Sequence, residues 1–474
     1  METPLFTALM EFKRRDTISF HVPGHKNGTV LSEVANPLYK EMLSVDVTEL
    51  TGLDDLHDPS GVIERAQQLT AELYGVKSSY FLVNGSTVGN LAMILACCGN
   101  DDVVLVQRNS HKSIMHALQL AGAHPVFLHP KIDQELMVPS YVEFETIKQA
   151  IEDYPNAKAL IITNPNYYGL SVDLSTVIEQ AHQARIPVLI DEAHGAHFIA
   201  GEQFPVSAVH IGADIIVHSA HKTLPAMTMG SFLHFNSEII DQSKVEYYLS
   251  ILQSSSPSYP IMASLDLARG YLEEIVVHNS SGQILEAVEA TIKEIEEIDG
   301  IELIYSNDEY VRRDPLKLTI RATDGRSGYE LQSWLEERNV FVELADPINV
   351  LLVLPLHKEN EGLAHLKTEG HQNANKFIQK LHYIKSEDEK KIYQLEHAYT
   401  FFQTCKKKVV PIDEAIGAFS YDSIVPYPPG IPFLVKGEKI TGEAIELLKD
   451  MIRLGVNIQG DNQLKKGKIT ILEK

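Results

Sequence analysis

The sequence predicts an α/β fold built on a mostly parallel sheet, and two observations carry this prediction. From Lys77 to about Phe235, short apolar runs alternate with segments of helical periodicity, and Gly, Pro, Asn or Asp bound each of them. A parallel sheet with crossover helices requires this alternation. The chain also has 474 residues, which is too long for a single hydrophobic core, so we expect smaller domains beside the large one.

The expected elements of the large domain follow one another along the chain. The apolar runs predict strands over residues 79–83, 103–107, 159–163, 188–191, 215–218 and 231–234, and the periodic segments predict helices over residues 87–98, 112–121 and 174–184.

The flanking segments predict an arm and two smaller domains. Residues 1–60 are rich in turn residues and charge, too polar for a core, and we expect them to fold over a site as an arm. Residues 265–297 have helical periodicity and predict one connecting helix. The segments IELIYS, KLTIRA, VFVEL and VLLVLP predict strands around the helix of GYELQSWLEERN, and the polar residues 357–391 predict a linker or exposed helices. We therefore expect domains over residues 1–60, 61–290, 291–395 and 396–474.

Composition excludes several classes of function. The 41 Lys and Arg against 64 Asp and Glu give a net charge of -23, which argues against nucleic acid or an anionic membrane as the main partner. Cys97, Cys98 and Cys405 have no paired spacing and predict buried thiols rather than disulfides or a metal site. The beginning of the chain lacks the apolar run of a signal peptide, and no stretch reaches transmembrane length, so we expect a cytoplasmic protein.

Two strand ends carry the residues that a pyridoxal-5′-phosphate (PLP) site needs. The segment VLIDEAHGAH ends an apolar run at Asp191, and ADIIVHSAHKTLPAM leads from another strand into Lys222. In open α/β sheets, ligands bind beyond the carboxyl ends of strands. Taken singly, Asp191 predicts only a carboxylate that caps a turn, and Lys222 predicts only a solvated surface charge. Together they indicate a carboxylate that keeps a pyridine nitrogen protonated and a lysine that forms a Schiff base.

Two further segments fit the same site. In YFLVNGSTVGNLAM, Ser86 and Thr87 open an apolar helix, where hydroxyls and backbone N–H groups can bind a phosphate. A simple N-cap is the commoner role of such residues. In VQRNSHKSIMHAL, His111 follows a strand end, where an imidazole can stack on a pyridine ring, although most such histidines are loop residues.

Together with HVPGHKNG, LDDLHDPSG and VPYPPGIPFLVKGEKIT, these segments resemble the ornithine/lysine/arginine decarboxylase family. The similarity runs from about Pro4 to Gly460 and corresponds to the short form that lacks a receiver-like domain. It implies a fold-type I PLP-dependent transferase-like large domain with a mostly parallel seven-stranded sheet, an N-terminal arm and smaller α+β C-terminal domains. It also implies a homodimer or a higher homo-oligomer.

The resemblance implies a role for each matching residue. Lys222 would be the Schiff-base lysine, Asp191 the partner of the pyridine nitrogen, and His111 the residue that stacks on the ring. The other implied cofactor residues are Ala193 against the opposite ring face, His194 near the cofactor oxygen, and Ser86, Thr87, Ser219 and His221 around the phosphate. His25, Asp54, Asp55 and Glu438 would line the substrate entrance.

The chain departs from the family pattern at two places. TLPAMTMGS follows the lysine, so Met227 and Met229 predict a more apolar wall there, and Lys436 stands where the family tail usually has proline. The methionines affect which substrate the site would accept, whereas Lys436 affects only the conformation of a turn.

The resemblance implies decarboxylation of arginine or lysine, less so of ornithine, and we expect His221 or Lys222 to reprotonate Cα. Another fold-type I reaction is an alternative, although the arginines near the C-terminal end stand in no context typical of a carboxylate clamp: Arg312, Arg313, Arg321, Arg326, Arg338 and Arg453. A regulator that binds PLP without turnover is the second alternative.

Overall fold

The structure is a computed structural model of the full chain. It describes residues 1–474 except 16, 361, 364–365, 367–390, 428, 454, 462 and 474, and only the backbone of residues 36 and 37. The chain divides into two compact units, one of residues 1–96 and 187–281 and one of residues 97–186 and 282–474. The predicted linker over residues 357–391 lies largely outside the described residues.

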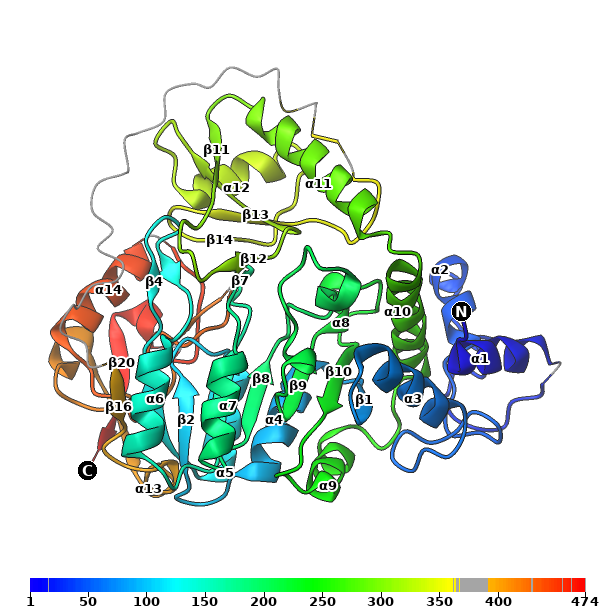
Figure 1. The fold of residues 1–474 in the computed structure, drawn as a ribbon, viewed down its shortest axis with the longest axis horizontal. Helices are drawn as coiled ribbons and strands as arrows, with labels where there is room; N and C mark the ends of the chain where they lie inside the picture. The colour runs from blue at the N-terminus through cyan, green and yellow to red at the C-terminus, as the bar shows by residue number, and fades with distance from the viewer. Residues whose placement is uncertain are drawn as a thin grey trace. The chain divides into compact units, whose positions relative to one another are not determined.

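The first unit is built around four neighbouring strands in the order β1-β10-β9-β8 (Figure 1). Strands β8 and β9 run parallel, while β10 runs antiparallel to β9 and to β1. Every residue of β8, β9 and β10 is buried, as their continuous apolar runs predict. The bounds are β1 (Ser78–Leu82), β8 (Val188–Asp191), β9 (Ile215–His218) and β10 (Ser231–Phe235).

The helices of the first unit include one that the composition of the arm did not predict. Helix α1 buries Leu5, Leu9 and Phe12, and its contacts are with α3 and α10, so residues 1–60 are not too polar to join a core. The helices are α1 (Pro4–Arg14), α2 (Asn36–Leu43), α3 (Val62–Tyr74), α4 (Gly85–Cys97), α8 (Ala220–Thr223), α9 (Gln242–Leu252) and α10 (Tyr259–Val277).

The second unit contributes four further strands in the order β6-β2-β3-β16. Strands β6, β2 and β3 run parallel, and β16 pairs antiparallel with β3. The seven strands expected for the large domain are therefore present, and β16 adds an eighth from a segment far along the chain. The bounds are β2 (Val103–Gln107), β3 (His124–Leu128), β6 (Leu160–Thr163) and β16 (Ile392–Gln394), with helices α5 (Lys112–Ala121), α6 (Phe144–Asp153) and α7 (Ser175–Gln183).

A separate four-stranded sheet, β11-β13-β15-β14, packs with α11 and α12 around its own apolar cluster (Figure 1). The expected strand in VFVEL is only the two-residue β14, and the single helix expected over residues 265–297 is two helices, because Asn279 adopts a left-handed backbone conformation between them. The bounds are α11 (Ser281–Glu296), β11 (Ile301–Ile304), β13 (Lys317–Ala322), α12 (Gly328–Glu336), β14 (Leu344–Ala345) and β15 (Val350–Val353).

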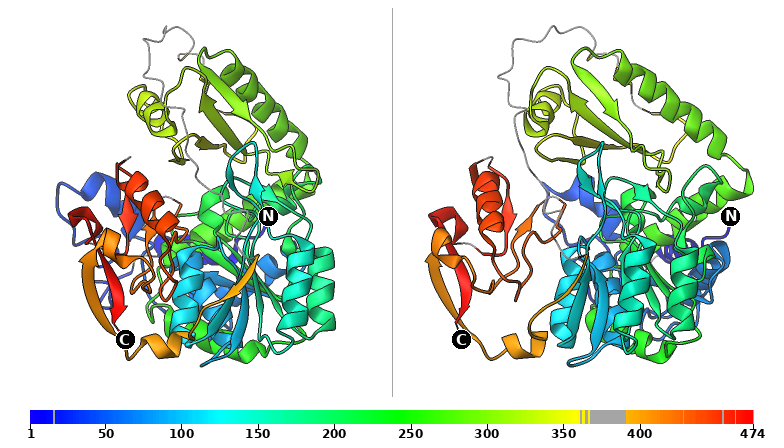
Figure 2. Two further views of the ribbon diagram at one scale, coloured as in Figure 1. Left: turned by 90° about the vertical axis from the view of Figure 1, so that its left-hand side faces the viewer. Right: turned by 60° about the vertical axis from the view of Figure 1, so that its left-hand side comes forward.

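The C-terminal part of the second unit has another small core. Helix α14 packs against the two-stranded ribbon of β17 and β20, as Figure 2 shows in red and orange. The bounds are α13 (Tyr399–Phe402), β17 (Lys406–Pro411), β18 (Val425–Pro426), α14 (Gly442–Arg453), β19 (Ile458–Gln459) and β20 (Lys468–Glu473). Among the helices of the described residues, none combines the length and the apolar character that crossing a membrane requires.

Candidate active site

Asp191 is the last residue of β8, and its side chain is held by two donors. It is 3% exposed. Asn90 of α4 donates from Nδ2 to Asp191 Oδ2 over 2.9 Å, and the backbone N–H of Ala193 donates to Oδ1 over 3.2 Å. Burial raises the pKa of the Asp191 carboxyl, while the charge of Lys222 and the Asn90 hydrogen bond act in the opposite direction.

Lys222 lies in the short helix α8, directly after β9. Its Nζ atom is 2.9 Å from Nε2 of His194, and its side chain is half-buried. The backbone N–H of Ser219 donates to the carbonyl of Ala193 over 3.2 Å, which ties the ends of β8 and β9 together. The structure therefore groups six of the predicted cofactor residues, His221 included, at the carboxyl ends of two adjacent parallel strands.

Ser86 joins this group from the first turn of α4. The Ser219 hydroxyl is 2.6 Å from the Ser86 hydroxyl and donates to it. The helix begins at Gly85, whose φ of 78° is in the region that favours glycine, and its N–H donates to the carbonyl of Met229 over 2.9 Å. Thr87 is exposed. Two hydroxyls and the start of a 13-residue helix therefore lie at the same strand ends.

His221 is tied to the turn that contains the two methionines. Its Nδ1 atom is 3.0 Å from the carbonyl oxygen of Gly230. A carbonyl oxygen only accepts, so Nδ1 carries the hydrogen. Met227 and Met229 are 38% and 43% exposed, so the apolar wall predicted there faces solvent in part.

His111 belongs to the second unit and caps helix α5. Its Nδ1 accepts from the backbone N–H of Ser113 over 3.2 Å. The side chain is half-buried. Its stacking on a cofactor ring stays a prediction.

The four residues predicted at a substrate entrance all have protein partners. Asp54 accepts hydrogen bonds from four backbone N–H groups at the start of α3 and from the N–H of Asp55, and Asp55 accepts from the N–H of His57 over 2.8 Å. His25 Nε2 is 3.2 Å from Asp46, and Glu438 pairs with Arg108 over 2.8 Å. Their roles toward a substrate stay predictions.

Three buried residues around the site were not predicted. Asn90 is the only amide or charged side chain in the apolar helix α4, and a lone polar residue there is a signal that sequence reasoning could have used. Glu192 and His218 form a fully buried pair, with His218 Nε2 2.6 Å from Glu192 Oε2. Strand register explains the pair, since Asp191 lies opposite Val217 and the next residues are Glu192 and His218.

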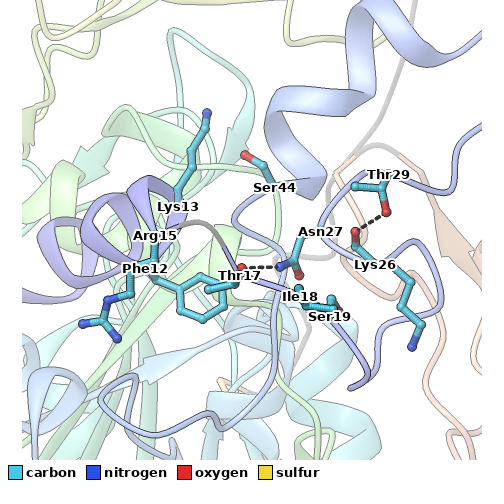
Figure 3. Close-up of a pocket in the computed structure, with 10 residues that line it drawn as sticks. All are labelled: Phe12, Lys13, Arg15, Thr17, Ile18, Ser19, Lys26, Asn27, Thr29 and Ser44. Atoms are coloured by element: carbon cyan, nitrogen blue, oxygen red, sulfur yellow. Dashed lines mark hydrogen bonds between the residues drawn. The ribbon is translucent and has the colours of Figure 1, made fainter.

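One pocket of about 460 Å³ lies in the N-terminal arm (Figure 3). Its lining includes Lys13, Arg15 and Lys26 together with hydroxyl side chains, and Asn27 donates to Thr17 over 3.3 Å. None of the predicted cofactor residues lines it. Within the described part of the chain, no group of three His, Cys, Asp or Glu residues could hold a metal ion.

The sequence matches two family profiles. Residues 3–309 match the Orn/Lys/Arg decarboxylase major domain, and residues 378–460 match the Orn/Lys/Arg decarboxylase C-terminal domain. This chain belongs to the Orn/Lys/Arg decarboxylase family. The predicted family is thereby confirmed, and the fold-type I architecture follows from it.

Similar proteins span nearly the whole chain. The uncharacterised protein YaaO of Bacillus subtilis is 48% identical over 99% of this chain and 98% of its own length. The arginine decarboxylase of the same organism is 35% identical over 97% of this chain and 95% of its own length. Among solved structures, the constitutive lysine decarboxylase of E. coli has a TM-score of 0.78 at 20% identity, over 100% of this chain and 82% of that one.

Proposed function

We propose that this protein is a PLP-dependent decarboxylase of a basic amino acid, with arginine and lysine before ornithine. One observation carries the proposal: a buried carboxylate, Asp191, and a lysine amine, Lys222, stand at the ends of adjacent parallel strands beside the hydroxyls of Ser86 and Ser219. This donor set fits PLP, which offers a basic ring nitrogen, an aldehyde and a phosphate.

Each residue has a distinct task in this proposal. When bound, PLP supplies an electron sink for the electrons of the bond that releases CO₂. Asp191, kept from water, holds a proton on the ring nitrogen, and Lys222 attaches the cofactor covalently. Ser86, Thr87 and Ser219 bind the phosphate at the helix start. His194 orients the Lys222 amine, and Ala193 leaves room against one ring face.

Glu343 is our candidate for binding a cationic substrate group, and this choice rests on the chemistry of its carboxylate. Its carboxylate is exposed and accepts from the Tyr167 hydroxyl over 2.7 Å, on the loop that follows β6. Two other carboxylates of the second unit are already engaged with protein groups: Glu438 pairs with Arg108, and Asp346 accepts from the N–H groups of Ile348 and Asn349. A guanidinium or ammonium group would satisfy the remaining lone pairs of Glu343.

The arginines near the C-terminal end favour decarboxylation over transamination. An aminotransferase needs an arginine that clamps the substrate carboxylate, whereas a departing carboxylate is better left unclamped. The guanidinium groups of several of them are bound to protein: Arg321 to Asn349, Arg326 to Asp324, Arg338 to the carbonyl of Trp334 and Arg453 to Asp450, while Arg313 stacks on Tyr305.

The test combines cofactor attachment with product analysis. The purified chain is incubated with PLP, reduced with borohydride and digested, and we expect the cofactor mass on the Lys222 peptide. Release of CO₂ and of the matching amine from arginine, lysine and ornithine then ranks the substrates. Attachment without any product would favour the binding-only alternative, and a keto acid product would favour transamination.

Substitution of Glu343 tests the substrate class. We expect Glu343→Gln to raise KM for the preferred basic amino acid by about tenfold or more with a smaller change in kcat, because one charge-assisted contact contributes about 1.5–3 kcal/mol. Glu337→Gln, an exposed carboxylate on the same small domain, is the matched control. An unchanged KM in Glu343→Gln would remove this residue from the proposal.

A further inference from the structure

The turn after β2 that carries His111 is held by residues from the far end of the chain. Arg108, 8% exposed, begins this turn. Its guanidinium donates to the carbonyls of Pro432 and Phe433 over 2.7 and 2.8 Å, and it pairs with Glu438 over 2.8 Å. The Tyr393 hydroxyl completes the set, 3.0 Å from Arg108 Nε.

The end of the turn is held in the same way. The backbone N–H of Lys112 donates to the carbonyl of Gly430 over 2.9 Å, and Lys112 Nζ donates to Gln459 over 2.6 Å. Residues on both sides of His111 therefore bind a group we call the C-terminal anchor, which consists of Gly430, Pro432, Phe433, Glu438 and Gln459.

Gly430 also approaches the imidazole of His111 itself. A Cβ atom at Gly430 would lie 3.1 Å from both Cδ2 and Nε2 of His111, which is closer than ordinary van der Waals contact. The φ of Gly430 is 89°, so this position favours glycine on conformational grounds as well. Ser113 holds the other ring nitrogen, Nδ1. A hydrogen bond thus holds one side of the ring, and the space on its other side is bounded by Gly430, where only a residue without a side chain fits.

We propose that the C-terminal anchor positions the His111 ring for its role toward the cofactor. This inference rests on the proposed function, in which His111 stacks on the cofactor ring. Glu438 then acts through Arg108 as a positioning residue. The catalytic rate falls steeply when a group that contacts the reacting molecule is misplaced by about 1 Å. A small shift of the turn that carries His111 should therefore lower the rate strongly.

The test compares two glycines of the C-terminal domain that share a left-handed conformation. In Gly430→Ala the new methyl group meets His111, whereas in Gly417→Ala, with φ of 85°, it meets nothing within 4 Å. Both variants carry the same backbone strain, so Gly417→Ala is the matched control. Each is made in the full chain, alone and together with His111→Ala, and visible circular dichroism of bound PLP, kcat, KM and Tm are measured.

We expect Gly430→Ala to lower kcat by about tenfold or more and to weaken the visible dichroism band, with KM and Tm close to those of Gly417→Ala. In the His111→Ala background, Gly430→Ala should add no further loss, because it acts through that ring. Equal effects of the two glycine variants, or full additivity with His111→Ala, would overturn the proposal.

Two further outcomes have to be distinguished, a Gly430→Ala variant that does not fold and a wild-type chain that does not bind PLP. If Gly430→Ala does not fold, Glu438→Gln replaces it, and we expect the same weakened band and the same non-additivity with His111→Ala. A wild-type chain that gives no visible band with PLP contradicts the proposed function instead, which separates the two failures.

Discussion

The environment of Asp191 suits the role that we propose for it, because the side chain is buried and held by specific partners. An exposed aspartate after a strand is a turn residue, but this one is 3% exposed and accepts from Asn90 and from the backbone of Ala193. Burial raises the pKa of its carboxyl, and the charge of Lys222 opposes that shift. A protonated ring nitrogen beside it would oppose the shift further and keep the carboxylate ionised.

The first prediction is that Asp191→Ala still binds PLP but loses turnover by on the order of 10²-fold or more, because the ring nitrogen no longer keeps its proton. The measurement is CO₂ release with PLP content determined on the same sample. Asp173→Asn, an exposed carboxylate, serves as the control and should match the wild type. Full activity in Asp191→Ala would refute the assignment.

Asp54 has a structural role that its sequence context does not reveal, while its predicted role toward a substrate stays a prediction. The segment LDDLHDPSG suggests a polar entrance, yet the Asp54 carboxylate caps α3 by accepting from the N–H groups of Ser60, Gly61, Ile63 and Glu64, as well as from Asp55. Burial alone would raise the pKa of Asp54, but these hydrogen bonds outweigh it and lower the pKa. Sequence does not show which backbone groups a loop carboxylate will meet.

The second prediction concerns Asp54. We expect Asp54→Ala to lower the free energy of unfolding by about 1–2 kcal/mol, as for other lost helix caps, and to leave KM unchanged. Because the pKa is lowered on folding, the stabilisation by Asp54 is present above the pKa of the unfolded chain and is lost as the pH falls through the folded value. Urea unfolding across this acid range should therefore show the difference between variant and wild type shrinking, and a raised KM would favour the entrance role instead.

Strand register brings together a buried polar chain that no single segment reveals. Glu192 follows β8, His218 ends β9, His234 lies in β10 and Ser79 in β1. Each side chain contacts the next one. His218 Nε2 is 2.6 Å from Glu192 Oε2, His218 Nδ1 is 3.1 Å from His234 Nε2, and His234 Nδ1 is 2.8 Å from Ser79 Oγ. Burial, with the neighbouring His218 acting in the same direction, lowers the pKa of His234 and favours its neutral form.

The third prediction is that Glu192→Ala lowers the free energy of unfolding by about 2–6 kcal/mol, because it leaves two buried groups, Nε2 of the His218 ring and the Ser207 hydroxyl, without a hydrogen-bond partner at about 1–3 kcal/mol each. The double variant Glu192→Gln with His218→Gln keeps hydrogen-bonding groups at both positions, and we expect it to lose less stability. Urea denaturation of the PLP-free chain measures both. A double variant less stable than Glu192→Ala would contradict this account.

Elements with strong local signals could be predicted, and those set by distant contacts could not. The strands at residues 103–107, 188–191 and 215–218 and the helix at residues 112–121 match the predicted bounds, since each is a continuous apolar or periodic run between turn residues. Strand β3 contains Pro125, which hides its strand character. Strand β16 exists because it pairs with β3, far away in sequence. The placement of Asp191 and Lys222 could be predicted because each follows a recognisable strand. The roles of Asn90 and Arg108 could not, because they depend on contacts with residues far away in sequence.

At the scale of the whole molecule, the arm exposes more apolar surface than a solvated loop would. Large apolar side chains between residues 18 and 42 are exposed over most of their area: Ile18 83%, Phe20 92%, Val30 63%, Val34 95% and Leu38 78%. Apolar surface concentrated in one segment marks an interaction site. We propose that a second copy of this chain covers it, consistent with the homodimer that the family resemblance implies.

The fourth prediction is that Phe20→Ser together with Val34→Ser weakens a homodimer. Full burial of one large apolar side chain contributes about 1.5–3 kcal/mol, so removing two per subunit should raise the dimer dissociation constant by at least about tenfold. Sedimentation velocity over a concentration series measures this constant. Val277→Ser, 70% exposed in α10 and outside the arm, should leave it unchanged. A wild-type chain that sediments as a monomer at micromolar concentration would contradict the proposal, because these side chains would then remain in water without a partner.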